Sequence, residues 1–222
     1  MAPEPMGEAE RYKELGRILR ERTSPVSKTE LERIMLQLMK FFERTHGMPE
    51  PPELFLTEAA DVISRVFEIG EVIVALKDRS DGLFHFVAFI GMRKEVEMAY
   101  RKLAYNVDDV VSISKFPRIK LSPMIEFYPA EFRPYLEGEL DTFNRPSKII
   151  KERLSTDSMQ EGDYFCVYFH GFGNEVLGWF EFSRPRNDRL PSREAMLGLE
   201  LLACAVGRVV CEMEHLRSGV KK

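Results

Sequence analysis

Apolar residues recur at helical spacing along the first fifth of the chain and predict two helices there. In residues 8–22, Tyr12, Leu15 and Leu19 lie among basic side chains, a pattern typical of a solvated helix with a narrow apolar stripe. Ser27 and Glu30 match a capping box at the start of the second helix. The apolar face of this second helix consists of Leu31, Ile34, Met35, Leu38, Phe41 and Phe42.

Three prolines within residues 48–53 follow the second helix, and a helix interior does not accommodate them. We therefore expect an N-terminal helical segment over residues 1–47, a proline-rich linker over residues 48–56 and a globular domain over residues 57–218. Thr57 is then expected to cap the first helix of that domain.

After the linker, segments with helical spacing alternate with segments of period two. Residues 71–77 and 83–90 are predicted as two strands joined by a turn, and helical spacing resumes over residues 93–105. The stretch that follows, residues 106–163, is irregular and long for a compact domain, and such stretches are often functional. Its patterns predict extended pieces over residues 110–114 and 148–153 and a short helix over residues 129–136.

The last third of the chain has clearer periodicity. Residues 164–170 and 176–182 are two aromatic-rich segments separated by a glycine-containing turn, which predicts a β-hairpin. Pro191 then opens a final helix that continues to about Arg217. The chain is therefore expected to end its folded part on a long helix.

This order of elements resembles the GAF domain family. The segment VLGWFEF at residues 176–182, followed by LPSRE at residues 190–194, is similar to that family's last strand, loop and closing helix. Residues 71–75 with 86–91 resemble its opening hairpin, and FNRPS at residues 143–147 is similar to GAF domains of prokaryotic sensor histidine kinases and regulators. The resemblance implies an α+β fold with a central antiparallel sheet of five or six strands. Terminal helices would pack on one face, and short helices and loops would roof a pocket on the other.

The resemblance also implies a function class, a non-catalytic sensory domain of signal transduction that binds a small molecule or a signalling partner protein. Two departures from the family narrow the range of ligands that we expect. The Asn-Lys-Phe-Asp-Glu signature of cyclic-nucleotide-binding members is missing, and residues 106–163 contain no cysteine to attach a bilin. No cofactor is therefore expected, and the ligand stays unidentified at this level.

Strand alternation predicts which side chains line the pocket, because successive side chains point to opposite faces of a sheet. Phe165, Val167 and Phe169 form a dry face that we expect to lie against the terminal helices. The opposite face carries polar groups among apolar ones and is expected under a roof formed by residues 106–147. Its predicted ligand-binding residues are His85, Cys166, Tyr168 and Trp179. A filled core, in which the Tyr and Trp polar atoms find ordinary partners, stays open as the alternative.

Asn144 and Arg145 are the candidate ligand-binding residues of the irregular stretch. An arginine offers a rigid fork of donors suited to carboxylate or phosphate, and an asparagine supplies both donors and an acceptor. The alternative is structural: Asn144 shapes the turn before Pro146, and Arg145 pairs with Asp141 or Glu139.

Charge and cysteine content exclude several function classes. The 222 residues include 32 basic and 36 acidic ones, so no bulk field gathers nucleic acid or anionic membrane. The basic residues of the first helix accompany acidic ones, as on a solvated helix and not a recognition helix. Three cysteines without CxxC spacing indicate neither a disulfide framework nor a zinc site, and no apolar stretch reaches the roughly 20 residues of a membrane span. We expect a cytoplasmic protein with no metal, nucleic-acid or membrane partner.

Cys166 and His170 are the nearest approach to a catalytic pair in the sequence. They lie four residues apart on one predicted strand, about 13 Å along it, which is too far for a hydrogen bond. A GAF-fold redox enzyme similar to the free methionine sulfoxide reductases is an alternative function, although the cysteine placement differs. A purely structural dimerisation module is a third. We predict that Cys166 is buried and unreactive.

Two faces of the final helix predict how it packs. One broad face covers the sheet, and a second seam repeats at spacings of four and three, as in paired helices. The core face consists of Ala195, Leu199, Leu202, Val206, Val209, Val210, Met213 and Leu216. The seam consists of Leu197, Leu201, Cys204, Arg208, Cys211 and His215. We expect a homodimer in which this seam meets residues 31–42 of a partner chain, with Arg208 paired to a glutamate of the facing helix.

Overall fold

The computed structural model describes residues 13, 15–19, 29–45, 51–132, 139–148, 153, 155 and 157–219. Residues 13 and 15–19 are helical and are the described part of the first predicted helix. The helices are α2 (Glu30–Thr45), α3 (Pro52–Val66), α4 (Lys94–Tyr100), α5 (Val107–Val111) and α6 (Arg193–Gly219). The 3₁₀ turns are η1 (Ala130–Phe132), η2 (Glu139–Thr142), η3 (Pro146–Lys148) and η4 (Phe172–Asn174). The strands are β1 (Ile69–Lys77), β2 (Phe84–Ile90), β3 (Ala104–Tyr105), β4 (Ile119–Lys120), β5 (Ile125–Tyr128), β6 (Tyr164–His170) and β7 (Val176–Pro185).

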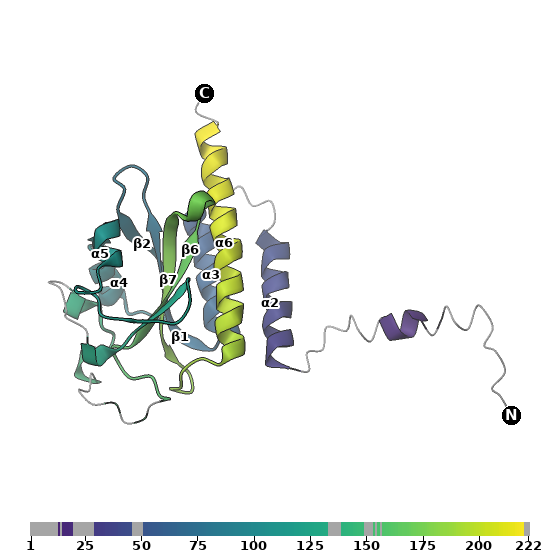
Figure 1. The fold of residues 1–222 in the computed structure, drawn as a ribbon, viewed down its shortest axis with the longest axis horizontal. Coiled ribbons are helices and arrows are strands. Elements are labelled where there is room, and N and C mark those ends of the chain that lie inside the picture. The colour runs from purple at the N-terminus through teal and green to yellow at the C-terminus, as the bar shows by residue number, and fades with distance from the viewer. Residues whose placement is uncertain are drawn as a thin grey trace.

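Seven antiparallel strands form one sheet in the order β3-β2-β1-β7-β6-β5-β4 (Figure 1). Both predicted hairpins, β1/β2 and β6/β7, are confirmed, and β1 pairs with β7 at the centre of the sheet. The α+β class is confirmed, but the sheet has seven strands instead of five or six. The edge strands β3 and β4 have only two residues each, which is too short for a period-two pattern to reveal them.

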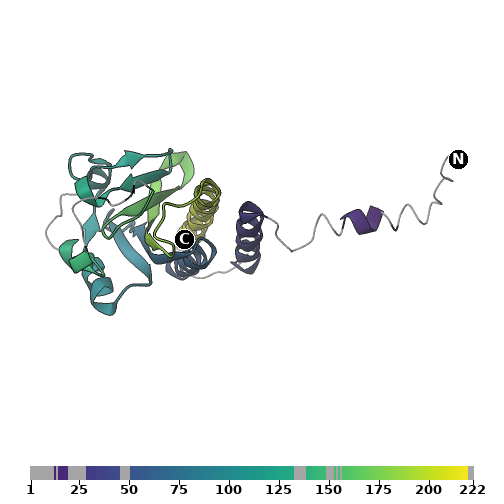
Figure 2. The same ribbon diagram turned by 90° about the horizontal axis from the view of Figure 1, so that it is seen from below.

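Three helices cover one face of the sheet. Helices α3 and α6 lie on it directly, and α2 forms an outer layer, as Figure 2 shows nearly along the helix axes. Phe165, Val167 and Phe169 are at most 2 % exposed beneath α3 and α6, so the predicted dry face is confirmed. Gly207 lets α6 approach β6 so closely that a Cβ there would lie 2.4 Å from the His170 carbonyl oxygen.

Helix α2 packs against its own chain. Its capping box is formed by Thr29 and Glu32, whose backbone N–H groups each donate to the other's side chain at 3.1 Å. This box lies two residues beyond the predicted one, whose Ser27 is outside the described residues. Ile34 and Phe41 are fully buried against α3 and α6. Of the apolar face predicted for this helix, Ile34, Leu38 and Phe41 are therefore used within one chain, whereas Leu31 and Met35 are exposed.

Three predicted segments differ from the structure. The helix expected over residues 93–105 ends at Tyr100, and Ala104–Tyr105 form strand β3 instead. Helix α3 begins at Pro52, inside the stretch expected as a linker, because proline is accepted at the first helical position, where no N–H is needed. Thr57 therefore lies within the helix, and its hydroxyl donates to the Glu53 carbonyl (2.8 Å). Helix α5 replaces an expected extended piece, since Asn106 Oδ1 accepts a hydrogen bond from the backbone N–H of Asp109 (2.8 Å) and caps the helix.

Two other expectations fall largely outside the described residues. The helix predicted over residues 129–136 is described only as η1, and residues 133–138 are not described. Within the extended piece predicted over residues 148–153, Lys148 ends η3 instead, and residues 149–152 are not described.

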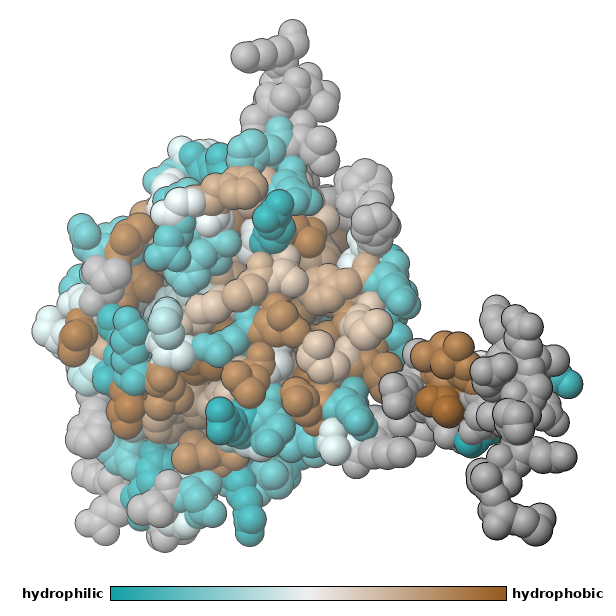
Figure 3. All heavy atoms as spheres, turned by 45° about the vertical axis from the view of Figure 1, so that its right-hand side comes forward, coloured by the Kyte–Doolittle hydropathy of each residue, from teal (hydrophilic) through white to brown (hydrophobic). Residues whose placement is uncertain are grey.

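Helix α6 presents both of its predicted faces. Its core face is confirmed at Ala195, Leu199, Leu202, Val206 and Val210, each at most 6 % exposed. Along the seam, Leu197 is 48 % exposed and Leu201 is 44 % exposed, and Cys204 is also exposed. Figure 3 shows apolar side chains gathered over α2 and α6. Cys211 was placed wrongly in the seam: it is buried in the core, because Gly207 one turn earlier brings this side of the helix onto β6.

Arg208 of the seam pairs within its own helix. Its Nε lies 3.1 Å from Glu212 Oε1, and its guanidinium lies 5.7 Å from the centre of the Phe172 ring. Within the single chain this pair takes the place of the expected pair with a facing helix. No helix in the described part of the chain is both long and apolar enough to cross a membrane.

Candidate functional site

The face of the sheet opposite α3 and α6 carries two rows of side chains across its central strands. In one row, Glu126 of β5, Cys166 of β6 and Glu181 of β7 are consecutive cross-strand partners. In the neighbouring row, Tyr168 of β6 lies opposite Trp179 of β7. Cys166, Tyr168 and Trp179 therefore share one face, as their alternation predicts.

His85 does not share that face. Strand β2 contains a β-bulge at Val87, the residue left without a partner on β1. The bulge reverses the alternation, so that Phe86 and Phe89 both face this side of the sheet while His85 points away. His85 Nε2 instead lies 2.8 Å from Asp81 Oδ2 at the hairpin turn. The prediction for His85 is wrong because a period-two pattern does not reveal a bulge.

The same turn gathers Asp78, Asp81 and His85, whose potential ligand atoms lie within 4.8 Å of one another. Hydrogen bonds within the turn explain this cluster. Asp78 Oδ1 accepts from the backbone N–H of Ser80 (2.7 Å), and Asp81 Oδ1 accepts from that of Leu83 (2.8 Å). These backbone bonds lower the pKa of both carboxyls. We therefore assign the cluster to the turn and not to a cation.

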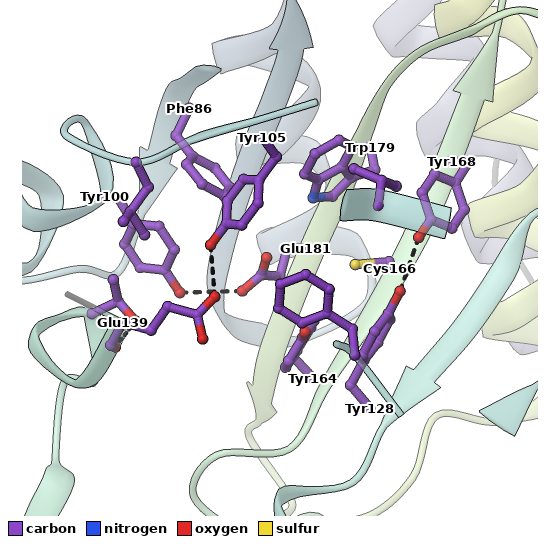
Figure 4. A pocket seen from close by; sticks show the side chains of 14 residues that line it. Phe86, Tyr100, Tyr105, Tyr128, Glu139, Tyr164, Cys166, Tyr168, Trp179 and Glu181 are labelled. Atoms are coloured by element: carbon purple, nitrogen blue, oxygen red, sulfur yellow. Dashed lines mark hydrogen bonds between the residues drawn. The ribbon is translucent and has the colours of Figure 1, made fainter. Parts of the chain in front are cut away.

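An aromatic cavity lies over the two rows (Figure 4). Part of its roof comes from Val110, Phe116, Glu139 and Thr142, which lie within the segment predicted for it, and the rest comes from α4, Leu103 and β3. Among the described residues that line it, the aromatic ones are Phe86, Tyr100, Tyr105, Phe116, Tyr128, Tyr164, Tyr168 and Trp179.

The aromatic cavity is small. The space open to the centre of a water molecule is about 40 Å³, which is room for about three waters at 10–15 Å³ each. Ring contacts fill the space around it: the centroids of Phe86 and Tyr100 are 4.8 Å apart, and those of Phe84 and Trp179 are 5.0 Å apart. Both sequence alternatives thus hold in part, because a largely filled aromatic core borders a small, partly open cavity.

Two buried glutamates reach the aromatic cavity from different elements. Glu181 of β7 is 9 % exposed and accepts a hydrogen bond from the Tyr100 hydroxyl (3.1 Å). Glu139 of η2 is 1 % exposed and accepts one from the Tyr105 hydroxyl (2.7 Å). The buried indole Nε1–H of Trp179 has no hydrogen-bond acceptor among the described residues. Such a donor costs about 1–3 kcal/mol, which a bound oxygen atom would offset.

Glu126 of β5 lies at one end of the row that it forms with Cys166 and Glu181. Its Oε2 accepts from the hydroxyls of Tyr128 and Tyr168 at 2.9 Å each, and Arg118 Nε lies 2.8 Å from the same atom. Burial raises the pKa of both tyrosines well above the ordinary value of 10.0, so both hydroxyls stay protonated and donate. The hydroxyl of Tyr168, predicted to meet a ligand, is thus engaged by the protein and fixes the cavity wall.

Asn144 and Arg145 line a second, more polar cavity of about 60 Å³ by the same measure. Asn144 is buried; its Nδ2 donates to Glu71 Oε1 (2.8 Å), and its Oδ1 accepts from the backbone N–H of Arg93 (3.1 Å). Arg145 Nη2 lies 2.5 Å from Glu161 Oε2, so its ion-pair partner is this residue and neither acidic residue of η2. These contacts tie the irregular segment to β1 and to the turn before β6.

The two cavities meet at Tyr100, Thr142, Tyr164 and Glu181, which line both of them. Of the six predicted site residues, the structure brings three together around the aromatic cavity, places two in the neighbouring polar cavity and leaves His85 outside both. Five of the predicted residues therefore lie in two neighbouring cavities that differ in polarity, and their role in ligand binding stays a prediction.

Four residues that give the aromatic cavity its polarity are absent from the predicted set. The signal for Glu181 is in the sequence, because it is the one charged residue of the strand segment 176–182 and alternation places it beside Trp179. Tyr100, Tyr105 and Glu139 come from three other elements and meet only in the folded chain.

The antiparallel sheet, with terminal helices on one face and short helices with loops over a cavity on the other, defines the GAF fold. No family profile and no curated protein sequence matches the chain. Among solved structures, the chain is similar to the GAF domain of a phosphoenolpyruvate-protein phosphotransferase from Coxiella burnetii, with 13 % identity, a TM-score of 0.54, and coverage of 87 % of this chain and 100 % of that one.

Two further structures have the same fold. The GAF domain of a protein named as a sensor histidine kinase from Pseudomonas syringae pv. tomato is 12 % identical, with a TM-score of 0.51 and coverage of 93 % of this chain and 98 % of that one. The phytochrome photosensory core module of Stigmatella aurantiaca is 10 % identical, with a TM-score of 0.51 and coverage of 82 % of this chain and 37 % of that one. At this identity the likeness establishes the fold and transfers no residue roles.

Proposed function

We propose that this chain is a sensory domain of signal transduction, in which a small molecule bound in the aromatic cavity changes the packing of the terminal helices. The observation that carries the proposal is that the cavity and the packing face of the terminal helices lie on opposite sides of the same two strands. Strands β6 and β7 present Cys166 and Trp179 to the cavity, while their alternate residues Phe169 and Phe180 pack beneath the helices. A shift of either strand therefore reaches both sides. The fold shared with a sensor histidine kinase and a phytochrome supports the same class.

The cavity favours binding over catalysis. A nucleophilic cysteine needs an accessible thiolate beside a positive group. Cys166 is 4 % exposed, and its cross-strand neighbours are Glu126 and Glu181. The redox-enzyme alternative therefore gains no support from this site.

A thermal-shift screen with nucleotides, amino acids, tetrapyrroles and small organic ions tests the proposal. A ligand of the folded state at 100 times its Kd adds about 2.7 kcal/mol of stability, or roughly 5–11 °C for a chain of this size. Cys166→Met, which extends a side chain into the cavity, should abolish the shift, whereas Cys204→Met on the exposed side of α6 should leave it unchanged.

Hydrogen exchange then tests transmission. Ligand binding should change amide protection in α6, which does not line the cavity. A shift that survives Cys166→Met places the ligand elsewhere. A ligand that binds in the cavity and leaves α6 unchanged contradicts the sensory proposal.

We further propose that the domain works as a homodimer through the outer surface of α6 and α2. Seven side chains support this proposal by their exposure: Leu197, Leu201, Cys204 and Arg208 on α6, and Leu31, Met35 and Met39 on α2. The exposed Leu and Met side chains leave 37 % to 55 % of their area open to water, and a second copy would cover this area. A purely structural dimerisation module would use the same surface without the cavity.

Light scattering tests the dimer. The wild-type protein should be dimeric at about 10–100 µM, an ordinary affinity range for such contacts. Leu201→Glu should give folded monomers. Met98→Glu, which changes a 51 % exposed residue on α4, should stay dimeric. A monomeric wild-type protein at these concentrations contradicts the proposal.

A further inference from the structure

We propose that the polar cavity beside Asn144 and Arg145 is a second binding site, and that its ligand is a small uncharged molecule with a primary amide or urea group. The sensory proposal uses the aromatic cavity and not this one, so the inference goes beyond it. Three features of the polar cavity carry the inference: polar atoms without partners, carboxylates that the protein already engages, and a small volume.

Gln160 and Arg145 supply the polar atoms without partners. The side-chain oxygen and nitrogen of Gln160 and the Nε of Arg145 are buried, and none of the three has a hydrogen-bond partner in the described part of the chain. Both residues line the polar cavity. Glu161 links them, because it follows Gln160 in the sequence and accepts from the backbone N–H of Arg145 (3.2 Å) while it pairs with the Arg145 guanidinium. One acceptor and two donor groups at the cavity wall are therefore unsatisfied.

A primary amide complements these three groups. Its N–H can donate to Gln160 Oε1, and its carbonyl oxygen can accept from Gln160 Nε2. The carbonyl oxygen has a second lone pair, which can accept from the Arg145 Nε–H. Because the Gln160 amide is buried, its side chain turns toward the ligand on binding, and this turn breaks no hydrogen bond of the amide to a described residue. A ligand with donors alone or acceptors alone would leave part of the set unpaired.

The carboxylates of the polar cavity are engaged by the protein, which disfavours a charged ligand. Glu71 accepts from Asn144 Nδ2 at 2.8 Å and, through its other oxygen, from the Ser183 hydroxyl at 2.9 Å. The two oxygens of Asp163 accept from the Arg153 guanidinium at 2.8 and 2.9 Å. A cationic ligand would compete with these donors, and an anionic ligand would lie beside the same carboxylates. An uncharged ligand avoids both costs.

The volume of the polar cavity limits the size of the ligand. About 60 Å³ of space for water centres is room for about four to six waters at 10–15 Å³ each. Propionamide, with five non-hydrogen atoms, matches this size. The ceiling on affinity per atom limits its Kd to no tighter than a few micromolar.

Nuclear magnetic resonance of the ¹⁵N-labelled full chain gives a test that locates the ligand. The probe is propionamide, titrated to about 100 mM at neutral pH and constant ionic strength, a range that covers the weak affinity of so small a ligand. Three comparison compounds have the same number of non-hydrogen atoms: butanone keeps the acceptor without the donor, propionamidine is a cation with donors only, and propionate is an anion with acceptors only. We expect propionamide to shift the backbone amides of Arg145 and Gln160 saturably, and the other three to bind about tenfold more weakly or less.

Gln160→Met is the decisive variant, because methionine keeps the length of the side chain and removes both amide groups. It should weaken propionamide about tenfold or more, and it should not lower stability in urea denaturation, since the amide that it removes has no partner among the described residues. Gln37→Met, the same substitution at an exposed position of α2, should leave binding unchanged. Arg145→Lys keeps a positive charge beside Glu161 and removes the Nε–H donor, so it should weaken binding by a smaller factor than Gln160→Met. Circular dichroism checks that each variant is folded.

Several outcomes would overturn the inference. If butanone, propionamidine or propionate binds as tightly as propionamide, the cavity does not recognise an amide. Wild-type affinity in Gln160→Met, a marked loss of stability in that variant, shifts confined to the aromatic cavity, or no saturable shift at all contradicts the polar site. Because the sensory proposal depends on the aromatic cavity and α6, each of these results leaves it standing.

Discussion

The contact of α6 with β6 gives a sharp test of the fold, through the substitution Gly207→Ala. Alanine is the better helix former by about 1 kcal/mol, so an unhindered site would gain stability. At Gly207, however, the new Cβ would lie 2.4 Å from the carbonyl oxygen of His170 and 2.9 Å from its backbone nitrogen. These atoms belong to a strand held between β5 and β7, so they cannot rotate away as a side chain can.

The magnitude follows from the two opposing effects. Overpacking in a close-packed core costs about 1–3 kcal/mol, and a clash with fixed backbone belongs at the upper end of that range. After the gain in helix propensity, we expect the free energy of unfolding to fall by about 1–2 kcal/mol. For a chain of this length this is a drop of roughly 2–8 °C in Tm.

Gly198→Ala is the matched control, because it gives the same gain in propensity on the same helix. Its Cβ would meet Ile34 Cγ2 at 2.6 Å and Phe67 Cε1 at 2.9 Å, which are side-chain atoms and not backbone atoms of the sheet. We expect a smaller loss of stability than for Gly207→Ala, because buried side chains repack more readily than strand backbone shifts. Urea denaturation of both variants measures the difference. If Gly207→Ala is as stable as wild type or more stable, the close approach of α6 to β6 is refuted.

Three further predictions concern single side chains. Arg153→Met should cost about 3–5 kcal/mol in urea denaturation, because the guanidinium pairs at 2.8 Å with Asp163, whose side chain is 0 % exposed; a loss under 1 kcal/mol contradicts this. In native protein at neutral pH, Cys204 should react rapidly with a thiol reagent and Cys166 should not, so rapid reaction of the double variant Cys204→Ser/Cys211→Ser, whose one remaining cysteine is Cys166, counts against the burial of Cys166. Burial lowers the pKa of His170 below 6.5, so the unfolded state binds the proton more readily and stability falls as pH drops through this value; His170→Gln should flatten that slope.

Periodicity by itself determines the elements whose faces differ strongly in polarity. The alternation of residues 164–170 predicts strand β6 with its bounds and its dry face, since Phe165 and Phe169 must leave water whatever the rest of the chain does. The same reasoning places Cys166 on the opposite face. It also predicts the core face of α6, because a helix of 3.6 residues per turn collects apolar residues on one side.

Other features of the protein depend on contacts between segments that are far apart in the sequence, and only the tertiary structure shows them. The bulge at Val87 turns His85 away from the cavity, because the register of β2 depends on its partner strand. Cys211 is buried because Gly207 draws its side of α6 onto β6. Glu139 and Glu181 become neighbours across one cavity although they lie far apart in the sequence. A local pattern specifies which side of an element avoids water, whereas the meeting of distant polar groups depends on how the whole chain packs.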